Sequence, residues 1–134
     1  MAAIQEALIY GMILAAGADR KLSDKELRQM AETTAFLPVF AGFGLDQLPA
    51  AAARCAELLQ EANGMELVLK EIQEALPKRL RATAYALACE VAIVDGVPSP
   101  EQRRMLRILR DRLDLDRLTS AAIERTIIAR YARP

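Results

Sequence analysis

The sequence contains no histidine and no tryptophan, and these absences remove several classes of function. Without histidine, neither a Ser-His-Asp triad nor a histidine-containing zinc site can form. Aromatic residues make up only 4% of the chain, which argues against stacking of single-stranded nucleic acid. The two cysteines, Cys55 and Cys89, form neither a C-x-x-C pair nor a metal-ligand spacing. We therefore expect both cysteines to be small buried residues of a protein in a reducing compartment.

The chain also lacks net charge, because 18 basic residues balance 18 acidic ones. A uniformly basic nucleic-acid-binding protein is therefore not expected. The charge is unevenly spread, since residues 1–77 carry 6 basic and 11 acidic side chains and residues 78–134 carry 12 and 7. Such a split suits two helical layers that face each other, and it could also attract cations to one half and anions to the other.

Long apolar runs and nucleotide-binding glycine motifs are missing as well. The longest apolar run, Ala7 to Ala18, is about a dozen residues, whereas a membrane-spanning helix needs about 20. It also lacks the basic region and cleavage site of a signal peptide, so we expect a cytoplasmic protein. Dinucleotide and P-loop fingerprints are absent, and catalysis by a Ser-His-Asp triad is impossible without histidine. Carboxylate pairs can perform acid–base work in principle, but the sequence indicates no pocket for them, so we expect no enzymatic activity.

The residues that are present favour helices. Hydrophobic residues reach 53%, alanine and leucine are abundant, and no long β-branched run alternates with polar residues. The sequence predicts one all-α domain over residues 1–134, with two pseudo-repeated halves of about 1–62 and 65–134. Asn63-Gly64 is expected to end the third helix. The seven expected helices are Ala2–Ala16, Asp24–Phe36, Pro49–Ala62, Met65–Ala75, Pro77–Val94, Pro100–Leu113 and Arg117–Tyr131.

A repeated pattern recurs 76 residues apart, as A-G-A-D-R-K-L-S-D-K-E-L-R from residue 16 and A-I-V-D-G-V-P-S-P-E-Q-R-R from residue 92. Each copy is an apolar helix, an aspartate, a short turn and a serine that opens the next helix. Ser23 with Glu26 and Ser99 with Gln102 have the spacing of capping boxes, and the glycine after Asp95 can adopt the positive φ of a tight turn. We call residues 18–23 and 94–99 the two corners.

The aspartates of the corners, Asp19 and Asp95, are not needed for the caps. They can form local side-chain-to-backbone turns. Alternatively, packing of the two halves about a pseudo-twofold axis brings them together, and Glu26, Glu101 or Asp24 joins them. These hard oxygen ligands select Ca²⁺, Mg²⁺ or Mn²⁺ over Zn²⁺. Neither corner has the pattern of an EF-hand loop, and nearby basic residues weaken any cation site.

The same residues resemble the tellurite-resistance TerB-like family over nearly the whole chain. The likeness is strongest from Arg79 to Asp116, where R-A-T-A-Y-A-L-A precedes V-D-G-V-P-S-P-E and then R-R-M-L, and the stretch Leu14 to Met30 fits the first acidic turn. The resemblance implies an all-α fold of two similar halves, about seven helices and an acidic surface that binds divalent metal. It also implies a link to tellurite and other stress resistance in bacteria, often near the membrane, and no enzymatic activity as a class.

Carried over residue by residue, the resemblance assigns Asp19 and Asp95 to the motif aspartates and Glu26 to the motif glutamate. In the second copy Gln102 occupies the glutamate position and Glu101 lies one residue earlier; in the first copy Arg20 stands where the family prefers glycine. The resulting hypothesis is a weak cation site made by Asp19, Glu26, Asp95 and Glu101, with Asp24 and Glu90 as outer residues and Ser23 and Ser99 as helix caps.

Three further features leave alternatives open. Glu90, beside an apolar helix face, either supports the cation site or pairs with an arginine of another helix. Arg103, Arg104, Arg107 and Arg110 form either a solvated helix face or a contact with phosphate or an anionic membrane surface. Phe36, Phe40 and Phe43 form either a plug that closes the core or an exposed protein-binding patch. The alternative function is therefore a helical scaffold for an unidentified protein partner, with the acidic corners serving only as caps.

Overall fold

The computed structural model describes residues 2–17, 22, 24–94 and 96–134, and within these ranges every regular element is helical. The predicted all-α fold with about seven helices is confirmed. Two short 3-10 helices, η1 (Pro38–Phe40) and η2 (Lys78–Leu80), accompany the α-helices. In chain order the described α-helices are α1 (Ala2–Gly17), α2 (Asp24–Thr34), α3 (Gln47–Leu59), α4 (Gly64–Ala75), α5 (Arg81–Ile93), α6 (Pro100–Arg112) and α7 (Arg117–Arg130).

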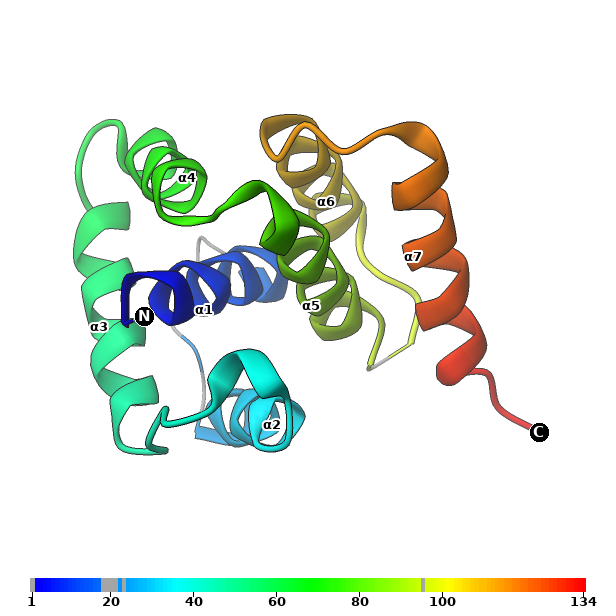
Figure 1. Cartoon of the computed structure of the whole chain (residues 1–134), viewed down its shortest axis with the longest axis horizontal. Coiled ribbons are helices and arrows are strands. Elements are labelled where there is room, and N and C mark those ends of the chain that lie inside the picture. The colour runs from blue at the N-terminus through cyan, green and yellow to red at the C-terminus, as the bar shows by residue number, and fades with distance from the viewer. Residues whose placement is uncertain (1, 18–21, 23, 95) are drawn as a thin grey trace.

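Helix α1 is the centre of the molecule. All of its residues from Ala7 to Ala16 are buried, and it packs most extensively against α5, with α3, α4 and α6 also in contact. Figure 1 shows α1 between α3 and α4 on one side and α5 and α6 on the other. A helix surrounded in this way has apolar residues on all faces, which explains why α1 carries no polar stripe. Among the described helices, none combines the length and hydropathy needed to cross a membrane.

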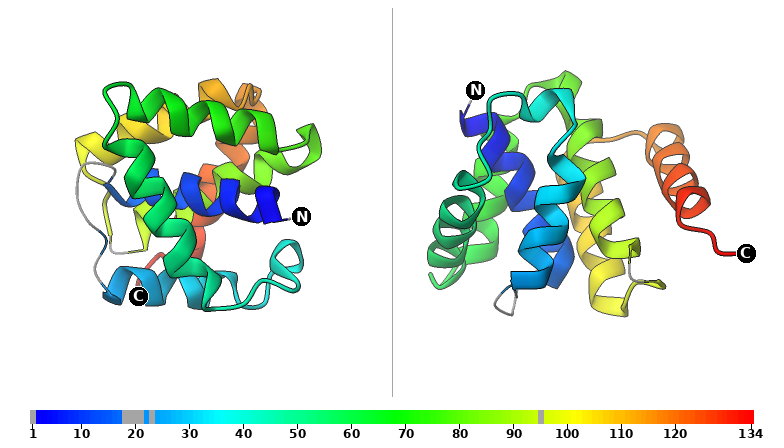
Figure 2. Two further views of the ribbon diagram at one scale, coloured as in Figure 1. Left: turned by 90° about the vertical axis from the view of Figure 1, so that its left-hand side faces the viewer. Right: turned by 90° about the horizontal axis from the view of Figure 1, so that it is seen from below.

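The order of elements repeats along the chain. The buried helix α1 leads into the first corner and then α2, and the mainly buried helix α5 leads into the second corner and then α6. An outer helix follows in each half: α3 packs against α1 and α4, and α7 packs against α5 at the edge of the molecule (Figure 2, right). The division of the chain into two pseudo-repeated halves stays a prediction.

The main departure from the expected helix boundaries is at Gly64. Helix α3 ends at Leu59, and Gly64 is the first residue of α4 instead of the stop signal of α3. Gly64 is buried, and a Cβ atom there would lie 2.5 Å from the carbonyl oxygen of Leu58. The glycine therefore allows two backbones to approach closely. The sequence cannot distinguish this need from helix termination, because both favour glycine.

Both cysteines are buried, as the sequence predicts. Cys55 on α3 and Cys89 on α5 are free thiols with no exposed surface. Burial raises the pKa of each to about 12, since a thiolate would lose its hydration in the apolar interior. At neutral pH both thiols therefore stay protonated and behave as small apolar side chains.

In the phenylalanine segment, some rings belong to the core and one lies on the surface. Phe40 is 5% exposed and meets the partly buried Phe43 edge to face, with ring centroids 5.4 Å apart. Gln5 fixes the segment to α1, because its amide nitrogen donates hydrogen bonds to the carbonyl oxygens of Val39 and Ala41, each at 3.2 Å. Phe36, in contrast, is 96% exposed. The plug is therefore made by Phe40 and Phe43, while Phe36 lies on the surface.

Alanine substitutions at two of these phenylalanines test the division. Phe40→Ala is expected to lower the free energy of unfolding by about 3–5 kcal/mol, because it removes a buried ring and leaves a cavity. Phe36→Ala, the matched control, is expected to change it by less than about 0.5 kcal/mol. Urea unfolding followed by circular dichroism measures both. Equal losses for the two variants would contradict the assignment of Phe40 to the core.

Candidate functional site

Three residues of the hypothetical cation site, Asp19, Asp95 and Ser23, lie outside the described residues. The structure does place the remaining members of the set. Glu26 and Asp24 lie in the first turn of α2, and Glu101 lies in the first turn of α6. Carboxylates at these positions are favourable near the positive end of a helix dipole, whether or not a metal binds.

The second corner ends in the predicted capping box. The Ser99 hydroxyl oxygen accepts a hydrogen bond from the backbone N–H of Gln102 at 3.1 Å, and the Gln102 amide oxygen accepts one from the backbone N–H of Ser99 at 2.9 Å. Gly96, in the same corner, has a φ of 117°, a conformation that other residues rarely adopt. The capping of α6 and the positive φ of Gly96 therefore agree with the local sequence.

Gln102 also makes a contact that the sequence pattern does not indicate. Its amide nitrogen donates a hydrogen bond to the carbonyl oxygen of Ala15 in the last turn of α1, at 3.2 Å. A glutamate at position 102 could complete the capping box, but a carboxylate has no donor for the Ala15 carbonyl. The glutamine therefore joins the start of α6 to the end of α1, which a glutamate at this position would not do.

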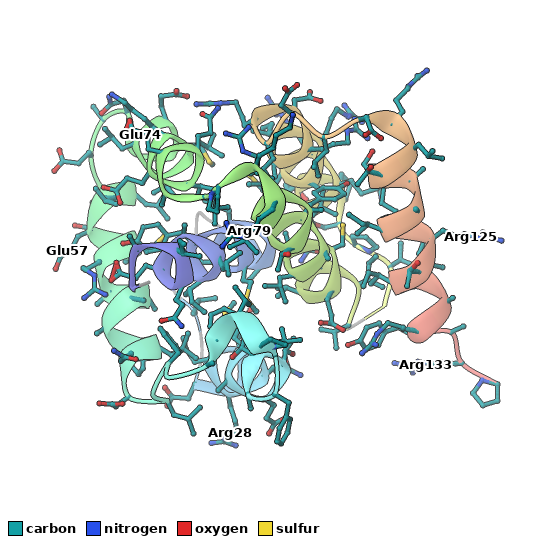
Figure 3. All side chains as sticks on the ribbon, in the orientation of Figure 1. Arg28, Glu57, Glu74, Arg79, Arg125 and Arg133 are labelled. Atoms are coloured by element: carbon teal, nitrogen blue, oxygen red, sulfur yellow. The ribbon has the colours of Figure 1, made fainter. Side chains whose placement is uncertain are left out.

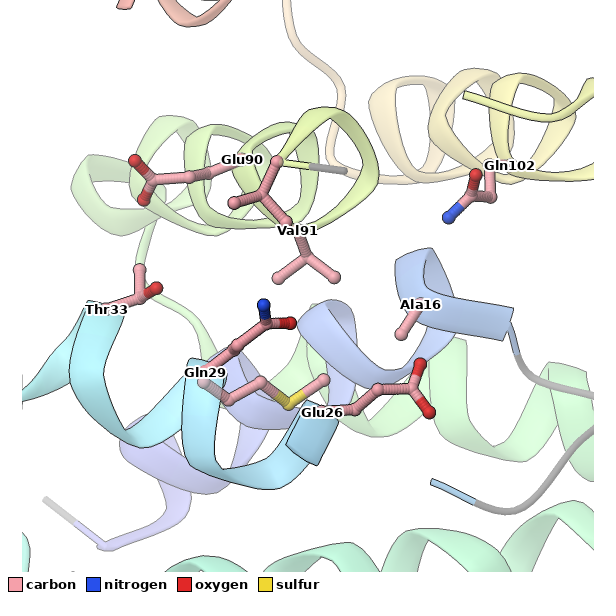
Figure 4. A pocket seen from close by; sticks show the side chains of 9 residues that line it. Ala16, Glu26, Gln29, Thr33, Glu90, Val91 and Gln102 are labelled. Atoms are coloured by element: carbon pink, nitrogen blue, oxygen red, sulfur yellow. The ribbon is translucent and has the colours of Figure 1, made fainter. Parts of the chain in front are cut away.

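A small cavity of about 50 Å³ lies beside this contact, between α1, α2, α5 and α6. Figure 4 shows Glu26 reaching from α2 toward Ala16, while Gln102 approaches Ala16 from α6. The Glu90 carboxylate points away from both. The cavity has room for about one or two water-sized groups and no larger ligand. It brings together Glu26 from the first repeat and Gln102 from the second.

Glu90 pairs with an arginine of another helix, which is the structural one of the two alternatives for this residue. Its side chain is 13% exposed, its carboxylate accepts a hydrogen bond from the Tyr131 hydroxyl at 2.8 Å, and it lies 3.3 Å from the Arg130 guanidinium. Burial and, secondarily, the hydrogen bond to Glu90 raise the pKa of Tyr131. The predicted pairing with an arginine of another helix is confirmed, and this carboxylate ties the end of α7 to α5.

Glu101 lies on the other side of the Ala15–Gln102 hydrogen bond. It is exposed and lines a much larger groove of about 860 Å³ between α6, the end of α1 and the connection from α3 to α4. Glu26 and Glu101 therefore face different hollows that share Ala16 and Gln102. Within the described ranges, no three acidic or cysteine side chains lie close enough together to hold a metal ion.

The resemblance to the TerB-like family rests on residues of this chain alone. No family model, no curated protein and no solved structure matches the sequence or the fold. The candidate site is accordingly defined by its geometry: two corners whose flanking helices meet at the Ala15–Gln102 hydrogen bond, with a small cavity on one side and a groove on the other.

Proposed function

We propose that this protein is a non-enzymatic TerB-like binding module whose two acidic corners form a weak site for Ca²⁺, Mg²⁺ or Mn²⁺. One observation carries the proposal: the 3.2 Å hydrogen bond from Gln102 to the Ala15 carbonyl. This bond joins the helix that leads into the first corner to the helix that leaves the second. It supports the expectation that residues separated by 76 positions act together.

The chemistry of the residues selects the ligand. Asp19, Asp95, Glu26 and Glu101 provide only carboxylate oxygens, which favour hard cations. The sequence has no histidine, and both cysteines are buried thiols with raised pKa, so softer ligands for Zn²⁺ are missing. Because Glu26 and Glu101 face different hollows, the two aspartates would supply the shared ligands. We expect modest affinity, because few carboxylates can converge.

The cellular role belongs to the same proposal and follows from the resemblance. A TerB-like module would act in the cytoplasm, or peripherally at the inner face of the membrane, in resistance to tellurite or related stress. It would work through a protein partner and not through nucleic acid, since basic and acidic residues balance and aromatic residues are few. Cation binding would then alter the corners that the partner meets.

Thermal unfolding of chelator-treated protein, titrated separately with Ca²⁺, Mg²⁺, Mn²⁺ and Zn²⁺, tests the cation site. A site with a dissociation constant of about 1 mM stabilises the folded state by about 1.4 kcal/mol at about 10 mM cation. For a domain of this size, that raises the midpoint by roughly 3–6 °C. We expect a saturable rise with one or more of the first three cations.

Three variants show whether the rise comes from the corners. Asp19→Asn and Asp95→Asn should each abolish it, because each removes one charged ligand. Asp46→Asn is the matched control, since Asp46 is an exposed acidic residue next to the start of another helix, α3. The proposal fails if millimolar Ca²⁺, Mg²⁺ and Mn²⁺ leave the midpoint unchanged, or if the rise survives both corner substitutions.

A further inference from the structure

The groove beside α6 is the larger of the two hollows described at the candidate site. Its floor is the end of α1, including Leu14 and Ala16, and its walls are α6 and the α3–α4 connection. Both walls lie at the end of α1 that is opposite the N-terminus (Figure 2, left). At about 860 Å³, the groove is within the usual size range for binding sites, whereas the cavity near Glu26 is too small for a side chain.

A polar clamp joins α4 to α6 one turn beyond Ile108. Both terminal guanidinium nitrogens of Arg112 donate hydrogen bonds to the Glu66 carboxylate, each at 2.7 Å. The Gln73 side-chain oxygen accepts a further bond from Arg112 at 2.7 Å. These contacts hold the start of α4 against the end of α6. The clamp therefore ties together the two helices that carry Met65 and Ile108, on opposite walls of the groove.

The apolar surface of the groove has the spacing of a helix. On α6, Met105 and Ile108 follow one another along one face, and Leu59 and Met65 stand on the opposite wall. Met65 is 36% exposed, although it is a large apolar side chain. A wall whose ridges repeat every three to four residues is complementary to another helix. Met65 can adjust to its side chains, because methionine is flexible and polarizable, whereas Met105 is 8% exposed and packs in the core beneath.

The charged side chains that line the groove, Glu101 and Arg104, both belong to α6. Both are exposed, and neither forms an ion pair with any residue in the described part of the chain. Arg107, one turn beyond, is likewise exposed and without such a pair. Arg107 does not line the groove, but at helical spacing it follows Arg104 along the solvent-exposed edge of α6, and this edge is therefore basic. A carboxylate on a docked segment would complement that edge.

We propose that this groove binds one amphipathic helix of a partner protein, with an apolar stripe facing Met65, Met105 and Ile108 and with acidic side chains along the edge that meets Arg104. This is the helix-in-groove mode of recognition. It gives the interaction-scaffold alternative a definite surface. It does not depend on the cation site, because the groove lining is described without Asp19 or Asp95.

Two designed peptides test the proposal. Each is a capped, fluorescein-labelled helix of about 18 residues with a leucine stripe at helical spacing. One carries glutamate on both edges of the stripe and the other carries lysine, so the direction of docking does not affect the comparison. Fluorescence anisotropy in chelator should show that the wild type binds the glutamate-edged peptide about tenfold more tightly than the lysine-edged one.

The protein variants separate charge from packing. Arg104→Glu should reverse the preference between the peptides, whereas Arg125→Glu, on the outer face of α7 (Figure 3), should leave it unchanged. Met65→Glu should weaken both peptides at least about tenfold, because it puts a charge in the apolar wall. Both groove positions are exposed, so folding should be retained.

Several outcomes would overturn the proposal. The proposal fails if neither peptide binds at about millimolar concentration. It also fails if Arg104→Glu leaves the preference between the peptides unchanged, or if the peptides bind the Met65→Glu variant as tightly as they bind the wild type. Analytical ultracentrifugation of the wild type and of Met65→Glu can also contradict the proposal. If the wild type is a dimer and Met65→Glu is a monomer, a second copy of the chain occupies the groove. Cation binding in the thermal assay, with or without peptide binding, decides the other proposal separately.

Discussion

Replacing Gly64 with alanine is expected to lower the free energy of unfolding by about 3 kcal/mol, the upper end of the usual cost of overpacking. A Cβ atom at this position would lie 2.5 Å from the Leu58 carbonyl oxygen and 2.6 Å from the Leu59 Cα. Both are backbone atoms, so no flexible side chain can move aside. The α3–α4 connection must shift, and with it the wall of the groove that carries Leu59 and Met65.

Gly11 provides a matched control inside α1. An added Cβ atom there would meet nothing within 4 Å apart from its own helix and immediate neighbours. Gly11→Ala should therefore stabilise the protein by about 0.5–1 kcal/mol, because alanine loses less conformational entropy than glycine in a helix. Urea unfolding measures both variants. The same sign for the two changes would show that close backbone contact at Gly64 is not what selects glycine.

The sequence predicts the helices well because each signal is local. Ser99 and Gln102 define the start of α6, and the apolar composition of α1 defines a buried helix. The Gly64 prediction is wrong because its cause is a contact between two backbones, which no local pattern reveals. The sequence identifies the phenylalanine segment but does not predict which of its rings are buried. The exposure of Phe36 and the burial of Phe40 depend on where the hydrogen bonds from Gln5 hold the chain.

The candidate site shows the same limit. The sequence identifies the repeated corners, and the capping function of Gln102 follows from its spacing. Its second hydrogen bond, to Ala15, joins residues 87 positions apart and depends on how α1 and α6 pack. The repeat aligns Glu26 with Gln102, and these two side chains line the same small cavity, whereas Glu101, one residue earlier, lines the groove. Asp19 and Asp95, which lie outside the described residues, can be tested only by the cation titration.

Alkaline pH is expected to destabilise the protein through its two buried thiols. Burial raises the pKa of Cys55 and of Cys89 to about 12, and the charge of Glu71 adds to the effect at Cys55. In the unfolded chain a cysteine has a pKa of about 8.5. Between these values the folded protein binds more protons than the unfolded one, so stability is full below about pH 8.5 and decreases as the pH rises toward 12.

The expected effect is a large fraction of the stability of a small domain. Each thiol contributes a slope of about 1.4 kcal/mol per pH unit across this window, so the two together remove roughly 5–7 kcal/mol between pH 8.5 and pH 11. That loss is comparable with the total stability of a typical small domain, about 5–15 kcal/mol. Tyr85 adds to it above about pH 10, because burial and a hydrogen bond to Glu124 raise its pKa in the folded state.

Urea unfolding at a series of pH values from about 8 to 11, with a reductant present, measures this slope. The Cys55→Ala/Cys89→Ala double variant will be less stable at pH 8, because it loses the packing of two sulfur atoms. Its free energy of unfolding should nevertheless fall less steeply with pH. The wild type releases about two more protons per molecule on unfolding than the variant does, one from each thiol. The two curves therefore converge as the pH rises, since the variant keeps only the tyrosine contribution and the other groups common to both proteins. Parallel curves for the wild type and the double variant would contradict this prediction, because they would mean that the thiols have the same pKa in the folded and unfolded states. Complete burial between α1, α3 and α5 makes a thiolate costly in the folded state, so we expect the two pKa values to differ.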